Sequence, residues 1–427
     1  MSSFDISEIR ELNGKYGMFR VLNSVNAEGK FLFSVSDSFV TKESDTLCGS
    51  EILEGYNPPF DADAVTLLKK AGGILVGKTN MDEFGINPYI TDGAYGIPKN
   101  PYGGDRTCGG PSSGAACAAA LLENTVSLGP SSCGSLSNSA AYCGIYGIVP
   151  TYGKISKNGL IDAGSSVDRV GVLASCSDNI RKYAKMLMDP CDESGSEVKV
   201  IGIPENVLDD VSEDVKNNFK KNLETLKTLG FEIKTIKLPS LESAAVACRV
   251  LTITEASTNM ARYCGMRYGR QDGDYTLESD EFFTSVRTEY FGSQAKKNIL
   301  LGTYMRMEGT SERYYNKSRM VRELLIEEYR SAFGECDVIL TPATESVAPT
   351  ISETSEMTMA ETYRADRFAA PPDLAGMPAL TVPCGYDGNG MPMGMLFVAD
   401  HNEEDRLFTL CDAWGENFDA VKPEAML

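Results

Sequence analysis

Two clusters of glycine and serine flank a run of small residues near the first third of the chain. The first cluster is GGPSSG at residues 109–114 and the second is GPSSCGS at residues 129–135. Between them, residues 115–122 (AACAAALL) predict a buried helix. Glycines let main-chain N–H groups approach a ligand closely. Serines beside such turns act as nucleophiles or satisfy local backbone groups. One such cluster alone indicates a loop, whereas two around a buried helix favour a nucleophilic serine site.

Charge and composition limit the classes of function. The chain has 427 residues, is 42% hydrophobic and carries a net charge of −20, with no Lys/Arg run. Nucleic-acid phosphates are repelled by such a charge, so we expect no direct nucleic-acid binding. No apolar run approaches the ~20 residues that a membrane-spanning helix needs, so we expect no membrane association. The polar N-terminus lacks a signal-peptide core, which predicts a cytoplasmic protein.

Cysteine and histidine usage argues against metal or histidine chemistry. The 12 cysteines include no CxxC pair, and the single histidine is His401. This pattern is typical of reduced, buried cysteines in a cytosolic protein. It argues against a zinc site, and a Ser-His-Asp triad would have to use His401. We expect no cofactor and no metal.

Helices and strands alternate along most of the chain, which predicts an α/β fold. The expected helices cover residues 61–70, 115–122, 178–188, 212–229, 243–263, 276–290, 299–308, 311–333 and 405–417. The expected strands include residues 74–77, 199–204, 231–236, 337–340, 380–383 and 393–398, with two more in FRVLNSV and FLFSVSD near the N-terminus. No segment is typical of a linker between two domains.

The glycine/serine clusters resemble the GGSSGGSA and GSDTGGSIR segments of the amidase-signature family, and most closely its GatA branch, the A subunits of tRNA-dependent amidotransferases. Further matching motifs are TLCGSEIL, GKTNMDEFG, PTYGKISKNGL and DLAGMPALTVPCG, in family order. The resemblance implies one domain over residues 1–427 with a shortened N-terminal segment. It also implies an amidase-signature fold, in which helices cover both faces of a large mixed β-sheet.

What the resemblance implies about catalysis is a Ser–cis-Ser–Lys triad, and this sequence keeps one member. The family's nucleophile falls on Ser135, which is present. The bridging serine falls on Pro111 and the lysine falls on Ser36, beside a retained Asp37. Proline has neither hydroxyl nor N–H, although it is compatible with a cis peptide. Serine at position 36 cannot act as a base at neutral pH, so the triad is degenerate.

Substitutes for the missing groups are few. A one-residue slip would let Ser112 or Ser113 replace the bridging serine, but neither supplies a base. Lys78 belongs to the separate GKTN motif, and we interpret it as a structural lysine that donates to loop carbonyls. Cys133 would need an activating cation or histidine to serve as a nucleophile.

The loop that would hold the oxyanion also departs from the family pattern. Its residues are Ser131, Ser132, Cys133 and Gly134 in place of the family's DTGG. A cysteine side chain where the family has glycine predicts a reshaped or partly filled loop.

The family's glutamine clamp is altered as well. The clamp's arginine position is occupied by Lys297 or Asn298, and the tyrosine region reads Cys248-Arg249. The clamp's aspartate is retained as Asp366, which we expect to be a substrate-binding residue. A carboxylate site without a bidentate arginine loses geometric selectivity.

These features favour a GatA-like amidase-fold protein that is catalytically impaired or inactive, a pseudo-amidase with a binding or structural role. Its expected partners are glutamine or another small amide, if the pocket is open, and a GatB-like subunit. One alternative is a working glutaminase A subunit that supplies ammonia for Gln-tRNA(Gln) or Asn-tRNA(Asn) formation. Another is an amidase that uses Ser135 on a different small amide.

Overall fold

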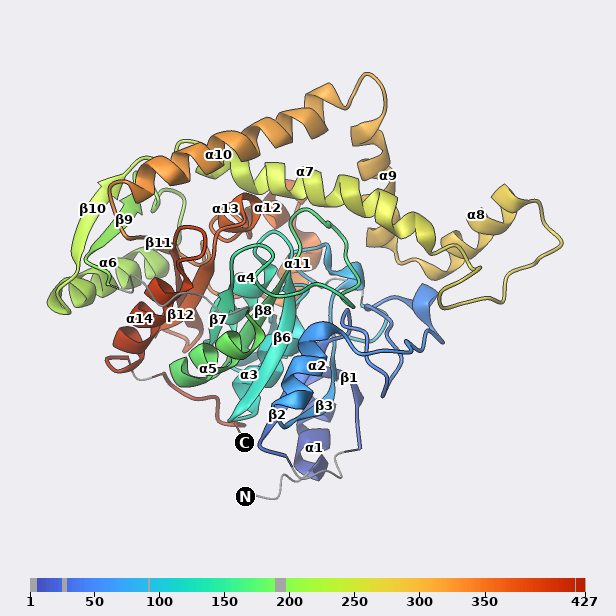
Figure 1. Ribbon diagram of the computed structural model, residues 1–427, viewed down its shortest axis with the longest axis horizontal. Coiled ribbons are helices and arrows are strands. Elements are labelled where there is room, and N and C mark those ends of the chain that lie inside the picture. Colours follow the sequence, from blue (N-terminus) through green and yellow to red (C-terminus); the bar gives the residue numbers. More distant parts are fainter. Residues whose placement is uncertain (1–5, 25–28, 91–92, 189–196, 419, 427) are drawn as a thin grey trace.

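A mixed sheet of eleven strands organises the part of the chain that the structure describes (Figure 1). The structure is a computed structural model, and it describes residues 6–24, 29–90, 93–188, 197–418 and 420–426. The strand order is β1-β3-β2-β6-β8-β7-β12-β13-β11-β9-β10. Strands β3, β2 and β6 are parallel neighbours, as are β11, β9 and β10, and the other pairs are antiparallel. The α/β fold with a large mixed sheet is therefore confirmed.

The strands have the following bounds: β1 Phe19–Leu22, β2 Phe31–Ser36, β3 Gly73–Thr79, β6 Thr125–Ser131, β7 Tyr146–Val149, β8 Arg169–Ala174, β9 Val200–Pro204, β10 Glu232–Ile236, β11 Val338–Pro342, β12 Ala379–Tyr386 and β13 Pro392–Val398, with a separate hairpin of β4 Lys99–Asn100 and β5 Gly103–Thr107. The helices are α1 Ile6–Tyr16, α2 Asp63–Lys70, α3 Ser113–Leu121, α4 Ser135–Tyr142, α5 Ser177–Leu187, α6 Glu213–Thr228, α7 Leu241–Asn259, α8 Ser279–Tyr290, α9 Ser293–Arg306, α10 Lys317–Phe333, α11 Ile351–Glu356, α12 Met359–Arg364, α13 Ala370–Ala375 and α14 Glu404–Gly415.

Helices cover both faces of the sheet. Side chains of α2, α5, α6 and α14 share one apolar cluster, and side chains of α4, α7, α10 and α13 share another. In β13, Met395 belongs to the first cluster and the next residue, Leu396, to the second. Because successive strand residues point to opposite faces, the two clusters lie on opposite sides of the sheet. Figure 1 shows α7 and α10 side by side, with α8 projecting away from the sheet.

Helix α3 is the small-residue helix that the sequence predicts, and all its residues are buried. Its small side chains let it approach neighbouring backbone closely. A Cβ on Gly114 would lie 2.4 Å from the carbonyl oxygen of Asn80 and 2.6 Å from that of Met18. The pattern did not indicate α4, which has three serines and an asparagine among its eight residues. These residue types favour turns over helix interiors, so burial of α4 against the sheet stabilises it instead.

Three parallel strands bring their carboxyl ends to one edge of the sheet. β2 ends at Ser36, β3 at Thr79 and β6 at Ser131. Asp37 follows β2, the GKTN motif forms the end of β3, and the second glycine/serine cluster begins at the end of β6 and continues into the loop before Ser135. The motifs that the sequence singles out therefore lie at this edge. Among the described residues, no helix combines the length and apolar character needed to cross a lipid bilayer.

Candidate functional site

Ser135 is the first residue of α4, directly after the loop that leaves β6. Gly134 precedes it in the left-handed conformation, with a φ of 85°. The Ser135 hydroxyl donates to the carbonyl oxygen of Pro130 at 3.3 Å and accepts the N–H of Ser132 at 3.4 Å. The residue is 3% exposed. The position after a tight turn at a helix N-terminus suits a nucleophile, but the hydroxyl hydrogen is directed at a peptide carbonyl.

The loop before Ser135 is held by a buried carboxylate. Asp373 Oδ2 accepts hydrogen bonds from the Ser131 hydroxyl and the Gly134 N–H, each at 2.6 Å. Its other oxygen pairs with Arg169. An oxyanion at the Gly134 N–H would therefore compete with a carboxylate already bound there. The sequence motif around Asp373 was recognised, but its contact with this loop was not predicted, because nothing in the sequence brings residues 131 and 373 together.

A second buried carboxylate holds the middle of the loop. Asp168 accepts the Ser132 hydroxyl at 2.5 Å and the N–H groups of Ala163 and Gly164 at 2.7 and 2.9 Å. Burial raises the pKa of Asp168 to about 7, although its hydrogen bonds oppose the shift. Near neutral pH, the carboxyl group is therefore partly protonated.

We expect this carboxyl group to make stability depend on pH. Its pKa is raised above the ordinary value of 3.8, so its stabilising effect is full below about pH 4. That effect is lost as pH rises through about 7. The Asp168→Asn substitution keeps the shape of the side chain but removes the titrating group. Between pH 4 and pH 7, the free energy of unfolding of the wild type should therefore fall by on the order of 3 kcal/mol relative to that of the variant. Urea unfolding of both proteins across this range measures the difference, and parallel profiles would show that Asp168 does not titrate there.

Cys133 adopts the left-handed conformation, with a φ of 60°, where the family pattern has glycine. Its sulfur lies 3.1 Å from the Thr252 hydroxyl on α7 and is fully buried. The side chain thus fills space between the loop and α7, in line with the expectation of a reshaped loop. Its described hydrogen-bond partner is neutral, and the Arg249 guanidinium lies close enough to interact with this residue electrostatically.

Pro111 lies at the turn into α3, and the described residues contain no cis peptide bond. The cis peptide with which proline at position 111 is compatible is therefore not formed. The neighbouring Ser112 is the residue that approaches the nucleophile position. Its hydroxyl donates to the Pro130 carbonyl at 2.8 Å, the same oxygen that accepts from Ser135. Both hydroxyls therefore direct their hydrogens to one carbonyl and neither accepts from the other.

Ser36 is the last residue of β2 and is fully buried. Its hydroxyl has no hydrogen-bond partner among the described residues. The position to which the resemblance assigns a lysine thus carries a short side chain whose hydroxyl bonds to no polar group within the described ranges.

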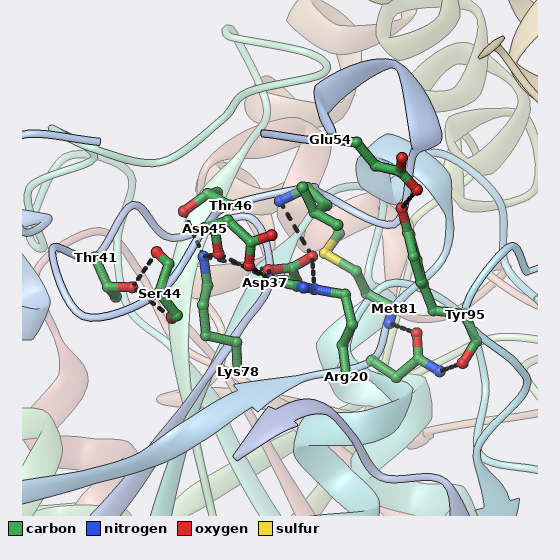
Figure 2. Close-up of polar contacts among 12 residues, drawn as sticks. Arg20, Asp37, Thr41, Ser44, Asp45, Thr46, Glu54, Lys78, Met81 and Tyr95 are labelled. Atoms are coloured by element: carbon green, nitrogen blue, oxygen red, sulfur yellow. Dashed lines mark hydrogen bonds and ion pairs between the residues drawn. The ribbon is translucent and has the colours of Figure 1, made fainter. Parts of the chain in front are cut away.

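Lys78 lies on β3 beside this strand, and its amino group contacts other residues (Figure 2). Its Nζ is 3.2 Å from Asp37 Oδ1 and donates to the Thr46 hydroxyl and, at 3.2 Å, to the Asp45 carbonyl. Figure 2 shows Arg20 reaching the same Asp37 carboxylate, with Nε 2.7 Å from Oδ2. Burial lowers the pKa of Lys78 to about 8, while Asp37 opposes that shift.

This geometry agrees with the interpretation of Lys78 as structural. An ammonium group has three hydrogens to donate, and the Nζ has three acceptors. With all three hydrogens donated, the Lys78 nitrogen has no lone pair that could accept the hydrogen of the Ser135 hydroxyl. Ser135 is also not among the described contacts of Lys78.

Asp366, the expected substrate-binding residue, is engaged by the chain itself. Arg249 pairs with its Oδ2, and the Asn138 side-chain amide donates to its Oδ1 at 2.7 Å. The Arg249 guanidinium also lies over the Tyr363 ring, 5.2 Å from its centroid. Burial raises the pKa of Asp366 to about 6, and Arg249 opposes the shift. A ligand ammonium would have to displace Arg249 to reach this carboxylate.

The sequence placed Arg249 in the altered clamp region but did not indicate its pairing with Asp366. The other clamp position, residues 297 and 298, lines a cavity of about 180 Å³. Asn298 donates to the Asn87 side chain at 3.2 Å. Tyr363 also lines this cavity, whereas Ser135 does not. The structure therefore brings Asp366 and Arg249 together and leaves Ser135 outside the polar cavity.

Comparison with known proteins identifies the family to which this chain is similar. The family model described as Amidase matches residues 31–408. The chain is 33% identical over 421 residues to the A subunit of glutamyl-tRNA(Gln) amidotransferase from Syntrophus aciditrophicus, covering 94% of this chain and 86% of that protein. It is 35% identical over 405 residues to the protein of the same name from Bdellovibrio bacteriovorus, covering 89% and 82%.

Solved structures agree on the fold. The crystal structure of the glutamyl-tRNA(Gln) amidotransferase A subunit from Thermotoga maritima superposes with a TM-score of 0.82 at 25% identity, covering 99% of this chain and 93% of that one. A 6-aminohexanoate cyclic dimer hydrolase has the same TM-score of 0.82 at 19% identity, covering 99% and 94%, which shows a shared fold alone.

Proposed function

Because the chain belongs to the amidase family, we propose that it is a GatA-like protein that uses the amidase scaffold for binding or structural work and does not hydrolyse amides. The observation that carries this proposal is the environment of the Ser135 hydroxyl. A serine attacks an amide only when a nearby base accepts its hydrogen. The hydroxyl's described partners are the Pro130 carbonyl and the Ser132 N–H. A peptide carbonyl is too weak a base, and an N–H has no free lone pair.

Two further contacts support the proposal. Lys78, on β3 next to the strand that ends at Ser36, donates its amino hydrogens to Asp37, Thr46 and the Asp45 carbonyl. The Gly134 N–H, a candidate oxyanion donor, is bound to the Asp373 carboxylate. An oxyanion hole works through donors that are free for the developing charge. A substrate oxyanion here would meet an occupied donor and a carboxylate of like charge.

The relatives suggest what the retained scaffold binds. They are named as A subunits of an amidotransferase, which implies at least one further subunit for those proteins. We infer that this chain associates with a GatB-like subunit.

A test of the catalytic part compares the wild type with Ser135→Ala for ammonia release from glutamine and from small amides. We expect the two proteins to be indistinguishable, because no base activates the serine. The Ser135→Ala substitution removes one hydroxyl from a buried site, so a matching urea midpoint establishes that both proteins are folded. Turnover by the wild type that Ser135→Ala lowers a hundredfold or more would overturn the proposal.

A second candidate is the working glutaminase A subunit, which the 33% identity across 94% of the chain favours. It predicts co-purification with a B-type subunit together with glutamine-dependent transamidation of charged tRNA. Our proposal predicts the co-purification without glutamine-dependent transamidation, so the two are separated by one assay on the same preparation.

A further inference from the structure

Helix α9 exposes apolar side chains on the face that points away from the protein. Its other face packs closely on α7, because a Cβ on Gly302 would lie 2.2 Å from the carbonyl oxygen of Ile253. The opposite face carries Leu300 and Tyr304, which are 72% and 49% exposed, and Met307, which is 55% exposed, directly follows the helix. Side chains three or four residues apart lie on the same side of a helix, so these three residues form one apolar stripe. A contiguous exposed apolar surface marks an interaction site, whereas isolated exposed apolar residues do not.

A cavity of about 590 Å³ between α8 and α9 extends this stripe into a groove. Leu300 and Ile299 of α9 line the cavity on one side, and Phe283 and Phe291 line it on the side of α8. Figure 1 shows α8 projecting beyond α9, away from the sheet, so the groove lies at the edge of the molecule. A groove with apolar side chains on both walls suits an amphipathic helix that lays its apolar face into it.

The charged side chains of α9 are all positive. They are Lys296, Lys297 and Arg306, and the helix contains no aspartate or glutamate, although the whole chain carries a net charge of −20. The two lysines precede Leu300 by four and three residues, which places them beside the stripe. Lys296 Nζ donates to the Thr288 carbonyl at 2.9 Å, and no carboxylate within the described ranges pairs with any of the three cations. The exposed face of α9 therefore combines apolar side chains with cations that lack an anionic partner.

Arg287 adds a cation on the α8 wall of the groove. Its Nη1 donates to the carbonyl oxygens of Met260 and Tyr263 at 2.8 and 3.1 Å, and no described carboxylate pairs with it. Partial burial lowers the pKa of Arg287, and a carboxylate in the groove would offset that cost of desolvation. The one acidic residue that lines the groove, Asp280, is seven residues from Arg287 on α8, about 10 Å along the helix axis.

We propose that the stripe on α9 and the groove beside α8 bind an amphipathic helix of a partner protein, whose apolar face is bordered by acidic residues. The apolar side chains of the partner pack on Leu300, Tyr304 and Met307. Its carboxylates accept hydrogen bonds from Lys296 and Lys297, which are free of competing carboxylates in the described part of the chain. Such charge-assisted hydrogen bonds fix the position of the partner helix along α9.

An acidic protein helix fits these charges better than the other occupants of such a surface. In a symmetric dimer that pairs α9 with its copy, the lysines would face their own counterparts, and like charges in contact oppose association. A nucleic acid or an anionic membrane carries a broad negative charge that would meet the exposed acidic residues of α8, which are Asp280, Glu281 and Glu289. A helix with a few carboxylates on the edge toward α9 avoids them. The inference does not depend on whether Ser135 is catalytic, because none of these groups is among the described contacts of that serine.

Fluorescence anisotropy of the full chain with two labelled peptides tests the proposal. The peptides are synthetic helices of equal length with the same leucine stripe, bordered by glutamates in one and by lysines in the other. We expect 1:1 binding of the acidic peptide at least tenfold tighter than that of the basic one, because only its charges complement α9. The net charge of −20 attracts the basic peptide at long range, so a preference for the acidic peptide reports on the local surface.

The Lys297→Glu substitution should weaken binding of the acidic peptide tenfold or more and tighten binding of the basic one, a reversal that loss of folding would not produce. Lys220→Glu is the matched control, since Lys220 is an exposed lysine of α6 with no described partner, and should leave both affinities unchanged. Leu300→Ser should weaken binding of both peptides tenfold or more, because they share the leucine stripe. Leu67→Ser on α2, where Leu67 is 39% exposed, should not.

Preference for the basic peptide, absence of saturable binding of the acidic peptide, or binding unaffected by Lys297→Glu or by Leu300→Ser would each overturn the proposal. A single-stranded oligonucleotide, phosphatidylserine vesicles and sedimentation of the chain alone test the other occupants. Binding of the oligonucleotide or the vesicles in place of the acidic peptide would overturn the proposal in favour of a nucleic acid or a membrane. A dimer that Leu300→Ser dissociates would overturn it in favour of a second copy of this chain.

Discussion

Replacing Arg249 by methionine should destabilise the protein by about 3–5 kcal/mol, because it leaves the Asp366 carboxylate buried without its cation. The side chains of the pair are 4% and 3% exposed. The loss should be larger at pH 8 than at pH 5. Asp366 already has a pKa raised to about 6, and removal of Arg249 raises it further, so the carboxyl group can take up a proton at low pH.

Urea unfolding at both pH values measures this effect. Adding Asp366→Asn should recover more than half of the loss, because the neutral amide needs no cation and still accepts from Asn138. Arg270→Met is the matched control. Its pair with Glu54 is about one-third exposed on both sides, so we expect a loss below about 1 kcal/mol. Equal losses in Arg249→Met and Arg270→Met would show that the buried pair does not hold the site together.

The Gly134→Ala substitution should destabilise the protein by about 2–5 kcal/mol, as the sum of left-handed strain and overpacking. Gly134 has a φ of 85°, and an added Cβ would lie 2.3 Å from the Cβ of Ala369. The loop would have to move, which would also disturb the bond from the Gly134 N–H to Asp373.

Gly230→Ala separates the two contributions. Gly230 has a φ of 96°, but an added Cβ there meets nothing within 4 Å. It should therefore lose only the ~1 kcal/mol of left-handed strain. Urea midpoints of both variants give the comparison, and a Gly134→Ala variant no less stable than Gly230→Ala would refute close packing around the loop.

Much of the fold could be predicted from local patterns. Helix α6 begins after Ser212, whose side chain accepts the N–H of Val215, and is followed by Gly230 in the left-handed conformation. Such caps are visible in sequence. Helix α4 could not be predicted from the sequence, because its serines favour turns and only burial against the sheet stabilises it. Helix α9 begins at Ser293, six residues before the predicted start at residue 299; it packs against α7 and is amphipathic only weakly.

The candidate site was predictable in its residue types and not in its contacts. The substitutions at positions 36 and 111 could be identified by register within short motifs. The pairing of Arg249 with Asp366, and of Asp373 with the loop of Ser131 and Gly134, joins residues more than a hundred positions apart. No periodicity or spacing encodes such contacts, because they depend on how the helices pack on the sheet. The peptide at Pro111 is not cis, so this family feature does not carry over to the substituted position.

Labelling with a fluorophosphonate tests most directly whether the Ser135 hydroxyl is activated. Such reagents form a covalent bond with serines whose hydrogen is taken up by a base. We expect intact-mass analysis and peptide mapping to find no adduct on Ser135 in the wild type, under conditions that fully label an active serine hydrolase. A stoichiometric adduct on Ser135 that is absent from Ser135→Ala would contradict the claim that this serine has no base.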